Sequence, residues 1–364
     1  MKQGWEVKKL GEVCDVINGY AFKSDRYADK GTRIIRITNV QKGFVVDDDP
    51  KYYSDEDMIG LNQYLLYEND LLMSLTGNVG RVGLLENKML PAALNQRVAC
   101  LRIKAVNVSL RYLFHYLNSS IFEQEAIISA SGIAQKNMST EWLKKHLIPL
   151  PPLPEQEKIV AELDCLSGII EKKKQQLKEL DALAQSIFYE MFGDPVENEK
   201  GWEVKKLKEV FNVKIGPFGS LLHNSDYVSG GTPLVNPIHM QNDKICPDFD
   251  FSVSDDKLAE LQPYLLQVND IIFARRGDIG RCAIVGKEEN GYLCGTGSLF
   301  IRPRESVNSV FFLKLFRCKS MVEYLTSLAK GATMLNINCK IIEDLTISLP
   351  PLSLQHSFAS KVEA

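Results

Sequence analysis

The 364-residue chain repeats itself, and this feature constrains its fold more than any other. Residues 4–10 read GWEVKKL, and residues 201–207 read the same seven letters. YLL and ND recur from 64–70 to 264–270, and LPPL recurs from 150–153 to 349–352. The matches keep their order, and their offset stays between 197 and 200 residues. This internal duplication predicts two copies of one domain, each of about 150 residues, rather than a single large core.

Each copy is predicted to mix short strands with helices, which gives an α+β chain of two pseudo-symmetric α/β domains. Apolar runs bounded by Gly, Asn and Asp predict strands, and apolar residues at helical spacing predict helices. The predicted strands are 33–37, 70–74, 99–103, 270–274 and 298–302, and the predicted helices are 109–129 and 307–329. PLPPLP at 149–154 predicts an extended strut, because proline fits neither a helix interior nor a central strand.

The segment 155–192 differs from both copies. It is rich in Glu, Lys, Gln and Leu, contains no proline, and is followed by Gly193 and Pro195. Apolar residues alternate at spacings of four and three, which favours a coiled-coil spacer over a helix packed on its own domain. At 1.5 Å per residue the rod would be about 55 Å long. The predicted seam is Ile159, Leu163, Leu166, Ile170, Leu177, Leu180, Ala184, Ile187 and Met191.

A second copy of this helix starts after the second LPPL. Gln355 and Phe358 match Gln156 and Ile159, and the printed sequence ends at Ala364. We therefore expect a truncated distal helix and an exposed seam, which would drive self-association or need a partner helix. The predicted divisions are 1–154 and 193–352 for the two domains, 155–192 for the spacer and 353–364 for the distal helix.

This organisation resembles the specificity subunit of type I restriction–modification systems over nearly the whole chain. The resemblance rests on the GWEVKKL starts, the ND strands followed by GNVGR at 77–81 and GDIGR at 277–281, the segments at Asn137 and Asn336, and the LPPL struts. It implies two target recognition domains that each read one half of a split sequence in double-stranded DNA. The helices would set the gap between the halves.

The resemblance also implies partners and the absence of catalysis. Two methyltransferase subunits and the restriction (translocase) subunits would bind this subunit. S-adenosylmethionine, ATP and Mg²⁺ are expected only on those partners, so this chain would need no cofactor and no metal. Two alternatives stay open at this point, namely a truncated scaffold or regulatory remnant that self-associates through its unpaired helix, and a weak nuclease.

Candidates for DNA contact are the side chains with hydrogen-bond donors or acceptors that flank the predicted strands. Arg81 and Arg281 recur in both copies, so each is either a phosphate contact or a surface ion pair. Thr76 against Arg276, and Asn78 against Asp278, differ between the copies and are better candidates for base choice. The candidates are Lys23, Ser24, Ser74, Thr76, Asn78, Arg81, Asn95, Gln96 and Arg97 in copy one, and Ser220, His223, Arg275, Arg276, Asp278, Arg281 and Thr296 in copy two.

Two further interpretations concern matched segments. Residues 23–41 and 219–241 share little, which fits either different DNA targets or ordinary drift after duplication. Asn137 and Asn336 stand just before predicted helices, and capping is favoured over DNA contact for both.

Motifs for catalysis are missing from the sequence. NPIH at 236–239 lacks the second proline and the aromatic residue of an adenine methyltransferase loop, and no phosphate-binding glycine loop occurs. Asp70, Glu86 and Lys88 loosely match a nuclease triplet, but copy two does not repeat it. The eight cysteines show no Cys-x-x-Cys spacing, which is typical of reduced thiols in a cytoplasmic protein. No apolar run approaches membrane-spanning length, so no membrane partner is expected.

The charge balance argues against DNA binding by electrostatics alone. The formal net charge is −3, and residues 155–192 hold eight acidic against five basic residues. Free-standing nucleic-acid-binding domains are strongly basic. The sequence therefore predicts a reader that depends on its partners for affinity.

Overall fold

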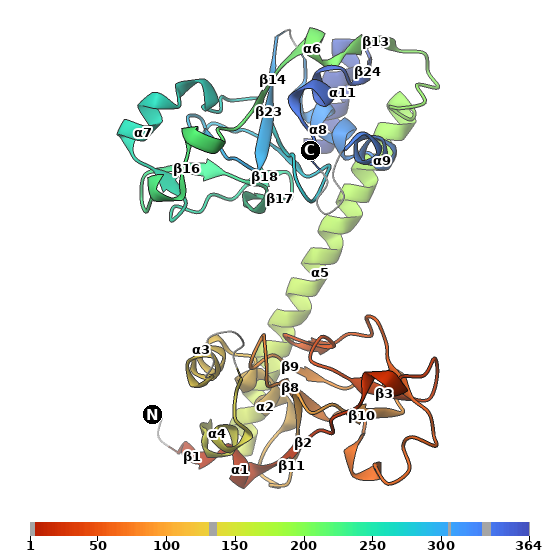
Figure 1. Cartoon of the computed structure of the whole chain (residues 1–364), viewed down its shortest axis with the longest axis vertical. Helices are drawn as coiled ribbons and strands as arrows, with labels where there is room; N and C mark the ends of the chain where they lie inside the picture. The colour runs from red at the N-terminus through yellow and green to blue at the C-terminus, as the bar shows by residue number, and fades with distance from the viewer. Residues whose placement is uncertain (1–3, 131–136, 305–306, 330–335, 364) are drawn as a thin grey trace. The chain divides into compact units, whose positions relative to one another are not determined.

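The computed structural model describes residues 4–130, 137–304, 307–329 and 336–363. It divides into two compact units, Met1–Lys173 and Lys174–Ala364, which we call unit 1 and unit 2. The two units contain similar sequences of elements, which Figure 1 shows in red to yellow for unit 1 and in green to blue for unit 2. The expected α+β class and the duplication are confirmed.

The elements of unit 1 begin with a short strand and end in a long helix. Its strands are β1 (Glu6–Lys9), β2 (Cys14–Asn18), β3 (Thr32–Ile35), β4 (Val40–Gln41), β5 (Phe44–Val45), β6 (Tyr52–Tyr53), β7 (Leu65–Leu66), β8 (Leu71–Ser74), β9 (Val82–Leu84), β10 (Ala92–Leu94), β11 (Val98–Ile103) and β12 (Leu147–Leu150). Its helices are α1 (Leu10–Val13), α2 (Leu110–Leu117), α3 (Ser120–Ser129), α4 (Thr140–Lys145) and the first part of α5 (Leu153–Phe192).

Two four-stranded sheets form the body of unit 1. The first is antiparallel, in the order β2-β11-β8-β9. The second has the order β6-β3-β10-β7, with β3 and β10 parallel. Leu71 and Met73 of β8 face a core shared with α2 and α3, whereas Leu72 between them faces the second sheet. Side chains alternate along a strand, so a strand covered on both faces reads as a continuous apolar run.

Unit 2 repeats this plan. Its strands are β13 (Glu203–Lys206), β14 (Phe211–Ile215), β15 (Tyr227–Val228), β16 (Thr232–Val235), β17 (Met240–Gln241), β18 (Lys244–Ile245), β19 (Ser252–Val253), β20 (Ile271–Ala274), β21 (Cys282–Ile284), β22 (Leu293–Cys294), β23 (Ser298–Pro303) and β24 (Thr346–Leu349). Its helices are the end of α5, α6 (Leu207–Val210), α7 (Asp255–Glu260), α8 (Ser309–Arg317), α9 (Lys319–Leu328), α10 (Cys339–Glu343) and α11 (Leu352–Glu363). The sheet orders are β14-β23-β20-β21 and β15-β19-β16-β22.

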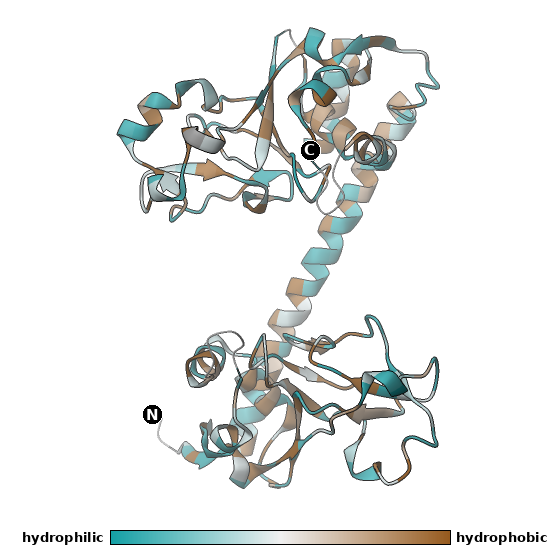
Figure 2. Ribbon diagram, viewed as in Figure 1, coloured by the Kyte–Doolittle hydropathy of each residue, from teal (hydrophilic) through white to brown (hydrophobic). Residues whose placement is uncertain are grey.

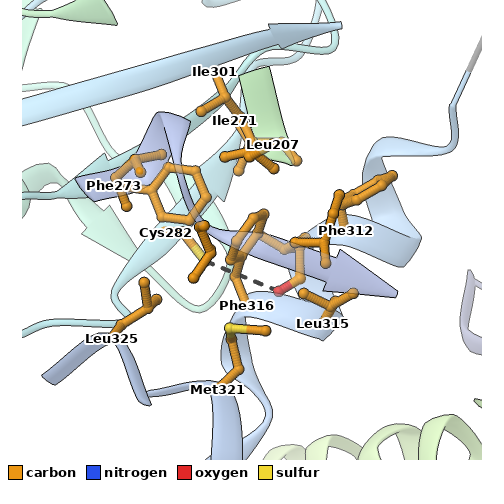
Figure 3. Close-up of a cluster of buried hydrophobic side chains, with 14 of the residues drawn as sticks. Leu207, Ile271, Phe273, Cys282, Ile301, Phe312, Leu315, Phe316, Met321 and Leu325 are labelled. Carbon is orange, nitrogen blue, oxygen red and sulfur yellow. Dashed lines mark hydrogen bonds between the residues drawn. The ribbon is translucent and has the colours of Figure 1, made fainter. Parts of the chain in front are cut away.

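The helix-side core of unit 2 is rich in phenylalanine. Figure 3 shows Phe273 of β20 against Phe316 of α8, with Phe312 of α8 on the other side of Phe316 and Met321 and Leu325 of α9 nearby. Phe273 and Phe316 meet edge to face, with their ring centroids 4.7 Å apart. Phe358 of α11 and the end of α5 complete this core.

The spacer is one uninterrupted helix whose ends belong to the two units. The ends of the predicted seam pack on the cores, with Ile159 against unit 1 and Ala184, Ile187 and Met191 in unit 2. Phe188 and Phe192 of α5, which lie within the predicted spacer 155–192, are part of the unit 2 core. Figure 2 shows brown, apolar segments within the mainly teal middle of α5. The exposed residues of the predicted seam are Leu163, Leu166, Ile170, Leu177 and Leu180. Pairing of this seam in a coiled coil stays a prediction.

Three local predictions differ from the structure. The segment 109–129 is two helices, because Ser119 accepts a hydrogen bond from the Phe122 amide and caps a new helix. The segment 307–329 also divides, at Cys318. The strut is half strand and half helix, since Pro149 lies in β12 at the edge of a two-stranded sheet and Pro154 lies in the first turn of α5, where no amide donor is needed.

Candidate nucleic-acid interface

An ion pair between a buried aspartate and a partly exposed arginine joins the same two strands in both units. In unit 1 the Arg102 guanidinium binds Asp70 through two hydrogen bonds of 2.6 and 2.8 Å. In unit 2 Arg302 binds Asp270 at 2.7 and 2.9 Å. Each arginine also donates to a backbone carbonyl, Leu65 O or Leu265 O. The hydrogen bonds from Arg102 to Asp70 stabilise the protonated guanidinium and raise the pKa of Arg102. We call these two bonds the framework pairs.

The recurring ND motif is explained by this arrangement. Asn69 and Asn269 have φ of 67° and 71°, a left-handed conformation that asparagine tolerates better than most residues. The turn places the next residue, Asp70 or Asp270, almost fully buried beside its arginine. The motif is therefore structural in both copies.

Backbone hydrogen bonds join four segments of unit 1 that are far apart in sequence. The Gln96 amide donates to Tyr20 O at 2.8 Å, and the Leu75 amide donates to Arg97 O at 2.9 Å. The Met138 amide then donates to Leu75 O at 2.8 Å. We call the segments 19–24, 75–81, 95–97 and 137–138 the loop surface of unit 1.

Unit 2 joins the equivalent segments with two matching bonds and one that differs. The Gly216 amide donates to Ser298 O, and the Arg275 amide donates to Gly297 O, both at 3.1 Å. The Ile337 amide donates to Arg275 O at 2.9 Å. The segments 216–223, 275–281, 295–297 and 336–337 form the loop surface of unit 2. Every sequence-predicted DNA candidate lies on or directly beside one of these two surfaces.

The candidates of unit 1 fall into two groups. Lys23, Ser24, Asn78, Gln96 and Arg97 are exposed. Thr76, Arg81 and Asn95 are half-buried, and Ser74 is buried. The Ser74 hydroxyl donates to Asn78 O and accepts from the Arg81 amide, so Ser74 shapes the loop from inside and does not present its side chain to a ligand.

The candidates of unit 2 divide similarly. His223, Arg276 and Asp278 are exposed, whereas Arg281 and Thr296 are half-buried. Arg275 is buried, and its Nε donates to Thr296 O at 3.1 Å. Burial, and then the neighbouring Arg276 charge, lower the pKa of Arg275. The side chain of Ser220 lies outside the described part of the structure.

The two shared arginines have different partners. Arg281 forms an ion pair with Asp278 at 2.6 Å and donates to Pro237 O. Arg81 instead donates to the Gln41 side-chain oxygen. The expected surface ion pair therefore occurs in unit 2 only, and Gln41 is a partner that the sequence did not reveal.

Asn137 and Asn336 are not helix caps, which corrects the interpretation favoured from the sequence. The capping side chains are Ser139 for α4 and Asn338 for α10. Asn137 instead forms a β-bridge with Thr76, and Asn336 forms one with Arg276. These bridges bring both asparagines onto the loop surfaces.

The comparisons with known proteins agree with this geometry. The family described as "Type I restriction modification DNA specificity domain" matches residues 2–182 and again residues 199–364. The chain belongs to this family. It is 23% identical over 385 residues to the type I restriction enzyme EcoBI specificity subunit of Escherichia coli, covering 99% of this chain and 78% of that protein.

Another relative and one solved structure extend the comparison. The EcoKI specificity subunit of Escherichia coli strain K12 is 21% identical over 391 residues, covering 100% of this chain and 82% of that one. The crystal structure of a type I restriction–modification S subunit from M. genitalium aligns with a TM-score of 0.51 at 15% identity, covering 99% of this chain and 88% of that chain. That likeness supports the fold. The chain is thus a type I specificity subunit with two specificity domains, which fits recognition of a two-part DNA target.

The nuclease-like residues of this specificity subunit serve other purposes. Asp70 is held by Arg102, and the Glu86 carboxylate pairs with Lys88 at 2.6 Å on the surface. Within the described ranges, no cluster of three or more His, Cys, Asp or Glu has the arrangement needed to hold a metal ion. The search of the described helices for a candidate membrane span also found none.

Proposed function

We propose that each unit reads one half of a split DNA target with its loop surface. The observation that supports this proposal is that the duplicated backbone structure presents different side chains in the two units. Two equivalent backbone bonds join the turn, the segment before β11 or β23 and the segment at Asn137 or Asn336 in both units, yet the exposed side chains differ. The GNVGR turn presents Asn78, and the GDIGR turn presents Asp278 beside Arg276.

The chemistry of the exposed side chains suits base and phosphate contacts. Arginine binds guanine edges through two hydrogen bonds, and asparagine and glutamine bind adenine edges. Each loop surface also retains one buried polar atom without a protein partner in the described structure, Thr76 Oγ1 in unit 1 and Asn336 Oδ1 in unit 2. Buried polar atoms normally find partners, so a bound ligand or water is expected there.

We further propose that the chain carries no catalytic step and works in the cytoplasm with partner subunits. The partners would be two methyltransferase subunits together with the restriction subunits, and they would hold S-adenosylmethionine, ATP and Mg²⁺. The exposed α5 residues Leu166, Ile170, Leu177 and Leu180 form an apolar stripe that a partner helix would cover. Binding of a second copy at this stripe is the competing arrangement.

The direct test is selection of DNA from a random duplex pool by the chain together with its methyltransferase subunits. We expect enrichment of a sequence with two fixed parts separated by a gap of fixed length. Retention of DNA without sequence enrichment would contradict the proposal. The chain without partners should bind the same DNA more weakly, because neither unit is strongly basic.

A further inference from the structure

The two loop surfaces differ most at one insertion. Gly19 and Gly216 are equivalent, because a side chain at either position would collide with the neighbouring loop backbone, at Asn95 O or Gly295 O. The next equivalent residues are Phe22 and Leu222, which are buried in the small outer cores of their units beside Ile34 and Leu234. Two residues lie between Gly19 and Phe22 in unit 1, and five lie between Gly216 and Leu222 in unit 2. Unit 2 therefore has three extra residues here, which accounts for the change of the repeat offset from 197 to 200.

The longer loop of unit 2 exposes an aromatic ring. Phe218 is 60% exposed, and Gly219 after it adopts a φ of +64°, a conformation that favours glycine. Leaving a large apolar ring in water is unfavourable by itself, and the insertion places this ring on a polar surface. Phe218 was not among the residues selected from the sequence, although the drift of the offset was a signal.

A buried guanidinium lies beneath the ring. Arg275 is 6% exposed, and its guanidinium carbon lies 6.0 Å from the centre of the Phe218 ring. Its Nε is fixed by Thr296 O, and no carboxylate of the described residues pairs with it. A cation over an aromatic face is attractive at this distance. The equivalent residue in unit 1 is the buried Leu75, which accepts the same backbone bond, so ring and guanidinium both belong to unit 2 alone.

We propose that Phe218 is a specificity residue that contacts the 5-methyl group of a thymine in the major groove of the half-site read by unit 2. Arg275 acts as a positioning residue that holds the ring. The inference rests on the proposed role of the loop surface in DNA contact. Phenylalanine is suited to the thymine methyl group, which is the only apolar group on the major-groove edge of a base pair. A ring that lies over Arg275, which is itself fixed by Thr296 O, is better placed for such a surface contact than for insertion between bases.

The test uses the complex of this chain with its methyltransferase subunits and the DNA sequence it selects. Each thymine of the target is replaced in turn by deoxyuridine, which removes only the methyl group, and the dissociation constant is measured by fluorescence anisotropy. The half-site read by unit 2 is identified with R276A, as the half of the selected sequence that changes in this variant. We expect one deoxyuridine in that half to weaken wild-type binding by about three- to tenfold. F218A should bind thymine and deoxyuridine equally, and F218L should keep part of the preference.

The controls separate this inference from the proposed function. F249A removes another exposed phenylalanine of unit 2, outside the loop surface, and should keep the full preference for thymine. R275L, which introduces the residue of unit 1, should reduce the preference without abolishing selective binding. If wild type selects its target but F218A shows the same deoxyuridine penalties, or if the half-site contains no thymine, the inference is overturned. If wild type selects no sequence, the proposed function itself fails.

Discussion

Units 1 and 2 share their interior and differ on their loop surfaces. The framework pair has the same partners in both units, down to the carbonyl that accepts the third hydrogen bond. Gln156 and Gln355 also agree, because each side chain accepts from the backbone before α2 or α8 and donates to a strut carbonyl. The constant residues therefore fix the strands and helices at the end away from the loop surfaces, and the variable residues lie on the loop surfaces.

The difference between the surfaces is one of charge and shape. Unit 1 has Leu75, Thr76 and Asn78 where unit 2 has Arg275, Arg276 and Asp278. The turn of unit 2 therefore has two arginines and a carboxylate that unit 1 lacks, and the neighbouring loop adds the exposed ring of Phe218. Two copies of one domain thus offer two different sets of contacts, as expected of readers of different sequences.

Breaking a framework pair should have the largest effect. D70A and D270A each remove both charge-assisted hydrogen bonds of a partly exposed guanidinium, which should cost about 1.5–3 kcal/mol of unfolding free energy. Urea unfolding followed by circular dichroism measures this. D278A breaks an exposed pair of the same residue types and should change the unfolding free energy by less than about 1 kcal/mol. Similar losses in D270A and D278A would refute the assignment of framework and surface.

Removing the side-chain amide of Gln156 or Gln355 should lower the free energy of unfolding by a smaller amount, which should be equal in the two units. Q156A and Q355A each remove a buried glutamine and leave a partly buried backbone amide, of Ser109 or Asn308, without its acceptor. We expect a loss of about 1–3 kcal/mol in each variant, measured by urea unfolding. A large loss in one unit and none in the other would show that the shared interior is not equivalent.

Exchanging the variable turn residues should shift DNA affinity in opposite directions. N78D places a carboxylate on the loop surface of unit 1 and should weaken binding, whereas D278N removes one from unit 2 and frees Arg281. We expect changes of about two- to tenfold in the dissociation constant at low salt, decreasing as salt is raised. Anisotropy titrations at two salt concentrations test this, and shifts of the same sign would contradict it.

The smallest expected effect concerns pH and unit 1. Burial lowers the pKa of His146 below its ordinary value of 6.5, whereas the nearby Glu125 acts in the opposite direction. Tyr116 and Trp142 also pack against this ring. Because the folded pKa is depressed, the neutral ring contributes stability above the ordinary pKa and loses it as pH falls through 6.5 towards the folded value.

The matched control for this pH effect is present in the chain. Leu345 occupies the same place in unit 2, where its carbonyl accepts from Leu207 as the His146 carbonyl accepts from Leu10. H146L should therefore unfold with less pH dependence than wild type between about pH 7 and pH 5. An unchanged pH dependence of the urea midpoint in H146L would exclude His146 as its source.

The duplication and the apolar patterns predicted the architecture well, because strands covered on both faces and a long charged helix have distinctive periodicities. The break at Ser119 was missed, since apolar spacing continues through it while only the serine cap marks a new helix. The ends of α5 were also assigned to a separate spacer. The apolar residues that pack on the two cores and those that are exposed in the middle of the helix form one continuous pattern in the sequence.

The candidate site was predicted in outline but not in its roles. Donor side chains after strands led to loops that backbone hydrogen bonds join, and their contact with DNA stays a prediction. Ser74 is buried, and Asn137 forms a bridge and does not cap a helix. Gln41 and Phe218 could not be selected by residue type or motif. Their positions depend on which loops the sheet brings together, and that depends on long-range strand pairing.

The most direct test of the account is a map of methylated sites in DNA exposed to the chain with its methyltransferase subunits, for wild type and two matched double variants. T76A/N78A alters the loop surface of unit 1, and R276A/D278A alters that of unit 2. The account predicts that each double variant relaxes or changes one half of the methylated sequence and leaves the other half and the gap unchanged. A change in both halves from either variant, or an unchanged sequence in both variants, would contradict it.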